Sequence, residues 1–301
     1  MTLTESLFVI FAIIAIGIIC EKRKFFNSVQ IEGFEIFLFK IAMPCYLFTS
    51  TSNHDLTTLF HPSYISSFML AFFIITVIVA LYFRNKPWPE TIVRIFSCGY
   101  VNSAVYSLPI IIFLLDDPEG AILVTLMQLT IIQVIFITTL GAVTHKDKNI
   151  FIKLLSAILN PLTISTILGL VCNYLEFKPN ICIISITESI GNGATSIALF
   201  SFGLSLGDVK FNKKIISKEV VELVFIKNIL HPIIACFIGK YFFSLENYWL
   251  SALIITSSSP TAFIVYIIAK KYSIDQDLAK RVIALSSIIS LITLIIIAYM
   301  I

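Results

Sequence analysis

Ten long apolar runs, separated by short polar connections, extend along the whole chain. Each run has about 20 residues, which as a helix is enough to cross the roughly 30 Å of hydrocarbon in a bilayer. The pattern therefore predicts an all-α membrane protein with ten transmembrane helices. We expect these helices near residues 5–20, 30–52, 63–83, 92–115, 119–143, 152–173, 181–207, 217–239, 247–270 and 277–300.

The composition excludes a soluble domain. Hydrophobic residues make up 58% of the 301 residues and charged residues only 13%, and the mean hydropathy is +0.96, which is far from the usual balance of soluble proteins. The six cysteines stand alone, so we expect them to pack as small apolar residues and not to form disulfides or a metal site. The formal charge of +3 comes from lysines in the loops and gives no indication of a nucleic-acid partner.

Most of the 21 lysines and arginines lie in every second connection. The five groups are Lys22, Arg23 and Lys24; Arg84, Lys86 and Arg94; Lys146, Lys148 and Lys153; Lys210, Lys213, Lys214 and Lys218; and Lys270, Lys271, Lys280 and Arg281. The positive-inside rule assigns these connections to the cytoplasm. It therefore predicts a multi-pass membrane protein with both termini on the non-cytoplasmic side.

Ten helices divide into two sets of five. Because five is odd, the second set must run through the membrane upside down relative to the first, which is the geometry of an inverted repeat. This predicts one transmembrane transporter domain over residues 1–301, with one repeat at about 1–145 and the other at about 150–301. Helices four and nine then occupy equivalent positions.

Helices four and nine each carry a proline near the middle of the membrane, Pro109 and Pro260. Proline has no N–H and clashes with the carbonyl four residues back, so we expect freed carbonyls on Val105 and Thr256. In hydrocarbon, a freed carbonyl must pair with protein, water or a ligand. Paired broken helices in matching positions are typical of the binding site of a secondary transporter, so the two prolines predict a carrier.

Polar residues near these prolines form the predicted binding site. Asn102 and Pro109 share one face of a helix, about 10 Å apart along its axis, and Tyr106 lies close to the same stripe. Of the two glutamines in helix five, Gln128 is expected to line the cavity and Gln133 to pack between helices. A half-helix N-terminus suits a carboxylate, so a small organic anion is the expected substrate. The remaining predicted binding residues are Ser257, Ser258, Ser259 and Pro260.

Four other polar residues lie inside predicted helices. Lys40 is either a counter-charge for an anionic substrate or a side chain that snorkels to the headgroups. Lys227 lies closer to its cytoplasmic end, so we expect it to snorkel. Glu188 either carries a coupling proton or lies in a hydrated vestibule, and His231 is expected to form hydrogen bonds between helices.

Short motifs along the chain resemble the auxin efflux carrier family in its short bacterial form. They are Ala15 to Arg23, Ile41-Ala-Met-Pro44, Asn102 to Pro109, Asn160-Pro161, Ala198 to Leu206, Ser258-Ser-Pro-Thr to Ala269-Lys-Lys-Tyr272, and Ser286 to Leu294. The resemblance rests on the order and spacing of these motifs and covers essentially the whole chain.

The resemblance implies two inverted five-helix repeats whose fourth and ninth helices cross at their prolines, as in bile-acid symporters and sodium/proton antiporters. It implies an elevator-type motion of spans three to five and eight to ten against spans one, two, six and seven. The family's binding residues carry over to Asn102, Gln128, Pro109 and Pro260. The chain departs from plant carriers at Gln133 and lacks their long hydrophilic loop, so malate- or malonate-like carboxylates are the expected substrates.

Three alternatives stay open at this point. A sodium-coupled bile-acid-type symporter belongs to the same class. A membrane-embedded enzyme of lipid metabolism would need clustered carboxylates, a metal-ligand set or a nucleophile with its base, and the sequence shows no such cluster; a non-transporting receptor would show no saturable uptake. We expect no catalytic residue, metal or cofactor. The expected partners are an organic anion and the lipid bilayer, with a proton or sodium as candidate coupling ion and a homodimer as candidate assembly.

Overall fold

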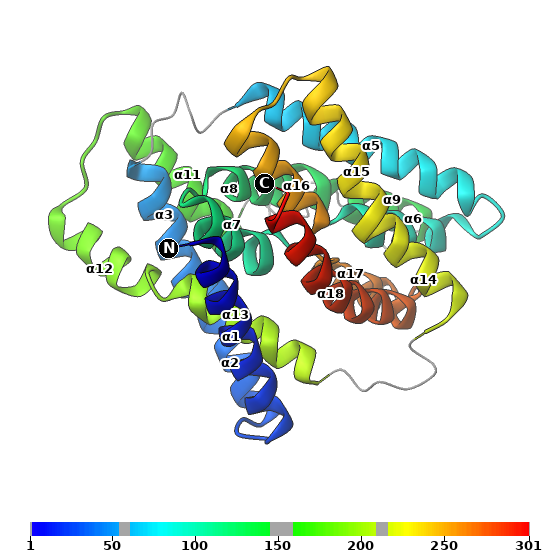
Figure 1. Cartoon of the computed structure of the whole chain (residues 1–301), viewed down its shortest axis with the longest axis horizontal. Helices are drawn as coiled ribbons and strands as arrows, with labels where there is room; N and C mark the ends of the chain where they lie inside the picture. The colour runs from blue at the N-terminus through cyan, green and yellow to red at the C-terminus, as the bar shows by residue number, and fades with distance from the viewer. Residues whose placement is uncertain (1, 54–60, 145–158, 209–215, 301) are drawn as a thin grey trace. The chain divides into compact units, whose positions relative to one another are not determined.

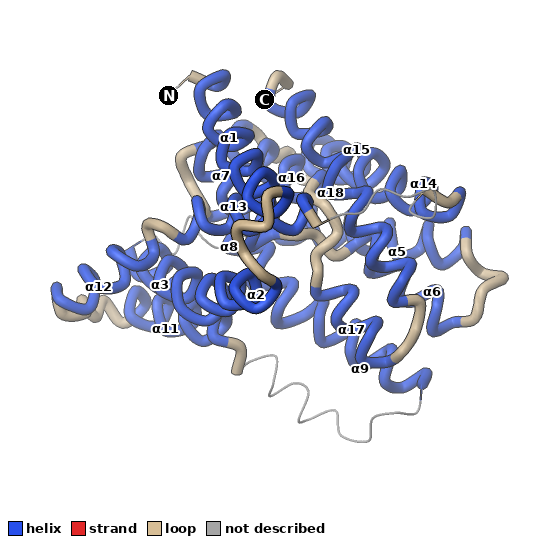
Figure 2. The backbone as a smooth tube through the Cα atoms, turned by 90° about the horizontal axis from the view of Figure 1, so that it is seen from below, coloured by secondary structure: helices blue, strands red, loops and turns tan. Residues whose placement is uncertain are grey.

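The computed structural model describes residues 2–53, 61–144, 159–208 and 216–300, and the regular structure in these ranges is helical (Figure 2). Each of the ten predicted segments contains helix, which confirms the all-α prediction. The start of the segment predicted at 152–173 lies outside the described residues, as do Lys146, Lys148, Lys153, Lys210, Lys213 and Lys214. Within the described residues, five helices are long and apolar enough to cross a membrane: Leu3–Lys22, Pro62–Tyr82, Glu119–Thr144, Lys218–Phe242 and Gln276–Ala298. That all ten segments cross it stays a prediction.

The chain forms two compact units that alternate along the sequence. Unit 1 comprises Met1–His61, Ala104–Thr130 and Leu155–Val209, and unit 2 comprises Pro62–Ser103, Ile131–Leu154 and Lys210–Ile301. The chain leaves one unit for the other inside two π-helical turns, η2 (Ser103–Ser107) and η3 (Gln128–Ile132). These units do not correspond to the two sequence halves of the predicted inverted repeat. The inverted repeat itself stays a prediction.

Unit 1 is a group of helices packed side by side (Figure 1). They are α1 (Leu3–Lys22), α2 (Ser28–Phe37), η1 (Leu38–Ala42), α3 (Met43–Asn53), α7 (Leu108–Leu115), α8 (Glu119–Met127), α11 (Pro161–Tyr174), α12 (Ile181–Gly191) and α13 (Ala194–Gly207).

Small residues let the helices of unit 1 approach closely. A Cβ atom on Gly203 of α13 would lie 2.2 Å from the carbonyl oxygen of Ile14 on α1, and one on Gly17 would lie 2.3 Å from a backbone oxygen of α13. Gly169 of α11 packs in the same way against Thr51 of α3. Close backbone contact at small residues is typical of helix pairs in membranes.

Unit 2 contains the other helices. They are α5 (Pro62–Tyr82), α6 (Trp88–Gly99), α9 (Gln133–Thr144), α14 (Lys218–Phe225), η4 (Ile226–Leu230), α15 (His231–Phe237), η5 (Ile238–Phe242), α16 (Asn247–Ser258), α17 (Ile264–Tyr272) and α18 (Gln276–Ala298). In Figure 1, α5 runs beside α6 and α15, and α16 packs against α15 and α18. Phe96 of α6 stacks on Phe136 of α9 with their ring centroids 4.0 Å apart.

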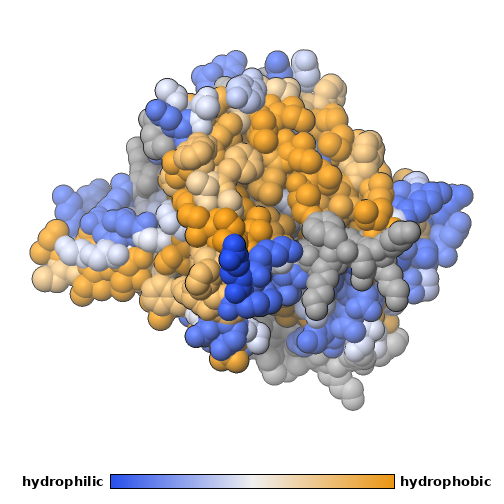
Figure 3. Space-filling view, turned by 60° about the horizontal axis from the view of Figure 1, so that its bottom comes forward, coloured by the Kyte–Doolittle hydropathy of each residue, from blue (hydrophilic) through white to orange (hydrophobic). Residues whose placement is uncertain are grey.

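Both units expose large apolar side chains. Phe8 and Ile16 of α1 are 74% and 54% exposed, and Phe73 and Leu81 of α5 are 61% and 65% exposed. Figure 3 shows a broad hydrophobic area on the face that it displays. Soluble monomers rarely expose apolar patches of this kind, so these surfaces fit contact with lipid acyl chains.

Candidate functional site at a helix crossing

Two helix ends of unit 2 meet through the backbone segments that follow them, residues 100–102 and 260–262, and we call this contact the crossing. Helix α6 ends at Gly99 and α16 ends at Ser258, and the extended residues that follow them form an antiparallel bridge between Val101 and Thr261. The Asn102 N–H donates to the Pro260 carbonyl at 2.8 Å, and the Ala262 N–H donates to the Tyr100 carbonyl at 3.2 Å. The bridge satisfies backbone groups that would otherwise be unpaired inside the protein.

The interruption after α16 follows from Pro260, but the freed carbonyls are not the one predicted. The Thr256 carbonyl accepts a hydrogen bond from the Ser259 N–H at 3.2 Å, so the prediction that it is free is wrong. The carbonyls released at the end of the helix are those of Ser257 and Ser258. Their oxygens accept hydrogen bonds from side chains of another helix. A helix end leaves its last carbonyls without intrahelical donors, and the break extends this to both serines.

The prediction that Pro109 interrupts the fourth predicted helix is also wrong. The break lies at Tyr100–Asn102, and Pro109 is a buried residue of the first turn of α7, directly after the π-helical turn η2. Proline is tolerated in the first turn of a helix because the N–H it lacks would be unpaired there. The π-helical turn, a common site of helix bending, therefore replaces the expected gap.

Lys227 and Asn228 supply the donors to the end of α16. The Lys227 Nζ atom lies 2.9 Å from the Ser257 carbonyl oxygen, and Asn228 Nδ2 lies 3.3 Å from that of Ser258 and 3.2 Å from that of Ser286. Both side chains belong to the π-helical turn η4, with exposures of 0% and 1%. The prediction that Lys227 snorkels to the membrane surface is therefore wrong.

Thr261 ties the crossing to α6 and to one further helix, α18. Its hydroxyl donates to the Ser97 carbonyl of α6 at 2.6 Å, and its N–H donates to Ser286 Oγ of α18 at 3.2 Å. Thr261 and Ser286 both came in only as members of motifs that carry the family resemblance, and neither was predicted to be a binding residue. Threonines and serines are common in membrane helices, so residue type alone gave no signal at these positions.

Thr261→Val is expected to destabilise the protein by about 1 kcal/mol, because valine keeps the shape and removes a buried hydrogen bond. The change should appear as a lower melting temperature of the purified protein in detergent. The matched control is Thr139→Val, at an exposed threonine of α9 whose hydroxyl bonds its own helix. Equal melting temperatures for both variants would contradict the role of Thr261.

The predicted serine cluster is buried at the crossing, but its hydroxyls bond their own helix. Ser257 Oγ donates to the Leu253 carbonyl at 2.7 Å, and Ser258 and Ser259 both donate to the Ile255 carbonyl at 2.9 Å. The groups of Ser257 and Ser258 that bond to another helix are their backbone carbonyls.

Gln133, which was expected to pack between helices, accepts a hydrogen bond from a residue of the crossing. The Tyr100 hydroxyl, on the extended segment of the crossing, donates to Gln133 Oε1 at 3.3 Å. Gln128 is buried in unit 1, with an exposure of 1%. The sequence-based preference for Gln128 as the residue near the crossing stays a prediction.

The predicted site residues fall in both units. Unit 2 brings together Asn102, Ser257, Ser258, Ser259 and Pro260, and unit 1 holds Tyr106, Pro109, Gln128 and Lys40. The Tyr106 ring is buried against Phe202, with 5.0 Å between centroids. Lys40 is exposed on η1 and Glu188 on α12. That all these residues form one binding site stays a prediction.

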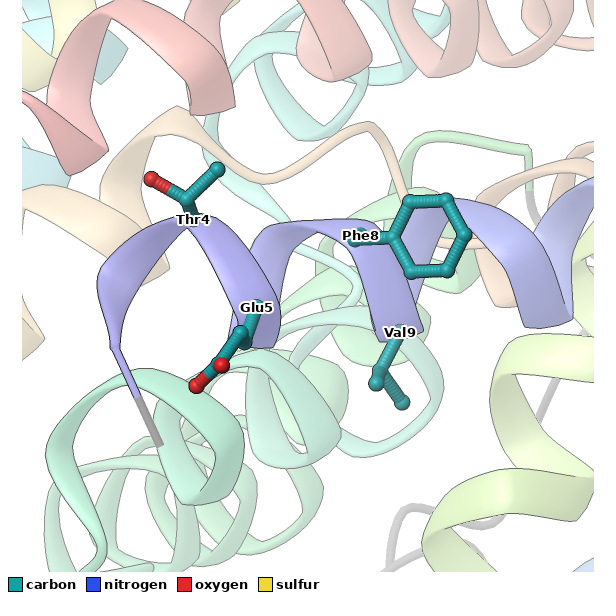
Figure 4. Close-up of a pocket in the computed structure, with 4 residues that line it drawn as sticks. All are labelled: Thr4, Glu5, Phe8 and Val9. Atoms are coloured by element: carbon teal, nitrogen blue, oxygen red, sulfur yellow. The ribbon is translucent and has the colours of Figure 1, made fainter.

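A surface depression on α1 is a weaker candidate for the functional site than the crossing. It is lined by Thr4, Glu5, Phe8 and Val9, and Figure 4 shows these side chains leaving one helix in diverging directions. The described residues contain no group of three His, Cys, Asp or Glu side chains that could hold a metal ion.

Comparison with known proteins gives two similarities. A family model described as "Membrane transport protein" matches the chain in two stretches, residues 2–151 and 147–298. A protein of Rhizobium meliloti (strain 1021) named "Putative malonate transporter" is 25% identical over 134 residues. That alignment spans 44% of this chain and 41% of the relative, so this likeness covers less than half of either protein.

Proposed function

We propose, because this chain belongs to the auxin efflux carrier family of membrane transport proteins, that it is a secondary carrier of a small carboxylate of the malonate or malate class. The name of the Rhizobium meliloti relative supports this substrate class. The family supports transport across a membrane, and the secondary-carrier mechanism and the substrate are the proposal.

The observation that carries the proposal is the backbone crossing in unit 2. Interrupted helices that expose peptide groups at mid-membrane are typical of transporter binding sites, and the bridge between Val101 and Thr261 joins two such interruptions. Asn102 is part of this bridge through its N–H, and its side chain is half-buried. A solute at the crossing would therefore meet the amide side chain of Asn102 beside backbone groups that are already paired with one another.

The charge near the crossing favours an anion. Lys227 is fully buried, and among the described residues it forms no ion pair. A buried ammonium without a carboxylate partner is costly. A substrate carboxylate nearby would reduce that cost.

The two units support an elevator-type mechanism. Unit 1 holds the predicted spans one, two, six and seven, and unit 2 holds spans three, eight, nine and ten. The scaffold inferred from the family resemblance has the same four spans as unit 1. The division departs from that expectation in spans four and five, because Ala104–Thr130 clusters with unit 1. We infer that unit 2 carries the substrate between the two sides, in a bacterial inner membrane with both termini outside.

The test is uptake of radiolabelled malonate by proteoliposomes that contain the purified protein. We expect saturable uptake that malate and succinate reduce by competition, and a loss of at least about tenfold in the Asn102→Ala variant, because a transport-site contact affects the transition state for translocation directly. Asn192→Ala, at an exposed asparagine at the end of α12, is the matched control.

Two results would contradict the proposal. One is the absence of uptake of any of these carboxylates by correctly inserted protein. The other is uptake by Asn102→Ala that equals uptake by the parent and by Asn192→Ala.

A further inference from the structure

The last carbonyls of α16 accept hydrogen bonds from side chains of the protein itself. Lys227 Nζ is 2.9 Å from the Ser257 carbonyl oxygen, and Asn228 Nδ2 is within 3.3 Å of the carbonyl oxygens of Ser258 and Ser286. All these residues belong to unit 2 and are buried.

A helix end of this kind is a natural cation site. The C-terminal carbonyls of a helix are unpaired and carry a partial negative charge. In transporters with broken helices, such half-helix ends and unwound carbonyls bind the coupling sodium ion or proton. Here the Lys227 Nζ atom lies against the carbonyl that such an ion would use.

In the part of the chain that the structure describes, Lys227 has no acidic partner that a second cation could share. The acidic residues that the structure describes in unit 2 lie at or near the ends of helices: Glu90, Glu219, Glu222, Glu246, Asp275 and Asp277. Glu222, which is nearest to Lys227 in sequence, pairs with Lys218. A sodium ion beside Lys227 would therefore meet like-charge repulsion in a low-dielectric interior.

We propose that the Lys227 ammonium takes the place of a coupling sodium ion at the crossing, so that the carrier binds and moves its anion without sodium. This inference rests on the proposed function, and it specifies the coupling of that same site. Lys227 acts as a positioning residue: it holds the end of α16 and supplies the positive charge that an anionic substrate needs. Asn228 extends the arrangement to α18 through the Ser286 carbonyl.

The first experiment measures carboxylate uptake by the parent protein in proteoliposomes with either sodium or potassium as the salt cation. We expect the two rates to agree within about twofold, because no ion binding is coupled to translocation. Uptake that depends on sodium would overturn the inference and leave the proposed function intact.

The second experiment needs no substrate and measures melting temperatures in detergent with sodium or potassium. In Lys227→Ala, the carbonyl of Ser257 loses its donor, so we expect sodium to raise the melting temperature of this variant and not that of the parent, as a ligand that binds only the folded state does. The matched control is Lys240→Ala, at an exposed lysine of the same helix, and it should behave like the parent. Sodium stabilisation of the parent would overturn the inference.

A third comparison separates charge from packing. Lys227→Arg keeps a cation and should retain uptake, whereas Lys227→Gln should lose at least about tenfold, since it removes the charge. If Lys227→Ala does not fold, this pair and the sodium test on the parent decide the question. Equal uptake by Lys227→Gln and the parent would overturn the inference. An absence of carboxylate uptake in every protein would instead count against the proposed function, and the melting experiment would still test the sodium site.

Discussion

Gly203→Ala is expected to destabilise the protein by about 3 kcal/mol or more, because the added methyl group has no room between two helix backbones. Its Cβ would lie 2.2 Å from the Ile14 carbonyl oxygen and 3.0 Å from the Cα of Gly17, both on α1. Backbone atoms cannot rotate away as a side chain would. Helices α1 and α13 must therefore separate along the contact that joins them in unit 1.

The measurement is thermal unfolding of the purified protein in detergent, with recovery of monodisperse protein as a second readout. Gly33→Ala is the matched control, because a Cβ on Gly33 of α2 would have no atom within 4 Å. Alanine is better than glycine in a helix interior by about 0.5–1 kcal/mol, so the control should be neutral or slightly stabilising. Equal melting temperatures for the two variants would show that the contact between α1 and α13 is looser than the structure describes.

Arg94→Met is expected to destabilise unit 2 by about 2–3 kcal/mol, since Glu219 and Asp275 lose their closest cation. Glu219 then keeps the longer pair with Lys86, at 3.9 Å. The Arg94 side chain is 3% exposed, and its Nη2 and Nη1 atoms lie 2.6 Å from Glu219 and 2.5 Å from Asp275. These contacts join α6 to α14 and to the start of α18. The carboxylates are about 30% exposed, so solvent screening reduces the loss below that of a fully buried pair.

The test compares the melting temperatures of Arg94→Met and Arg84→Met, since Arg84 is an exposed arginine after α5. A double-mutant cycle with Asp275→Asn should give a coupling energy of about 0.5–3 kcal/mol. A coupling energy near zero, or a similar loss in both single arginine variants, would mean that the pair with Asp275 does not hold these helices together.

The positions of the helices could be predicted from the sequence because hydropathy is a local property. The segment expected near 217–239 is the continuous helix Lys218–Phe242, and the interruption at Pro260 follows from the missing N–H of proline. The break at Tyr100–Asn102 could not be predicted in this way. It is stabilised by pairing with Pro260–Ala262, which is far away in the sequence, and the proline nearest to it is accommodated in a helix.

The chemistry of the crossing was only partly predictable for a related reason. Asn102, the three serines and Pro260 could be identified by residue type and position. Whether Lys227 snorkels or is buried depends on which face of its helix meets other helices, and a single helix pattern does not specify this. Lys227 lies about 14 Å from the start of the helix Lys218–Phe242. At this depth the sequence is compatible with both snorkelling and burial. The division into two units also depends on contacts between distant segments.

The bridge between Tyr100–Asn102 and Pro260–Ala262 has a consequence for how the protein is made. Thr261 follows its partner Ser97 by 164 residues, so at about 5–20 residues per second it leaves the ribosome roughly ten to thirty seconds later. Until then the extended segment after α6 has no backbone partner, and lipid offers none. The nascent chain must therefore hold this segment beside water or the insertion machinery, and a chain terminated before α16 should be a ready target for membrane proteases.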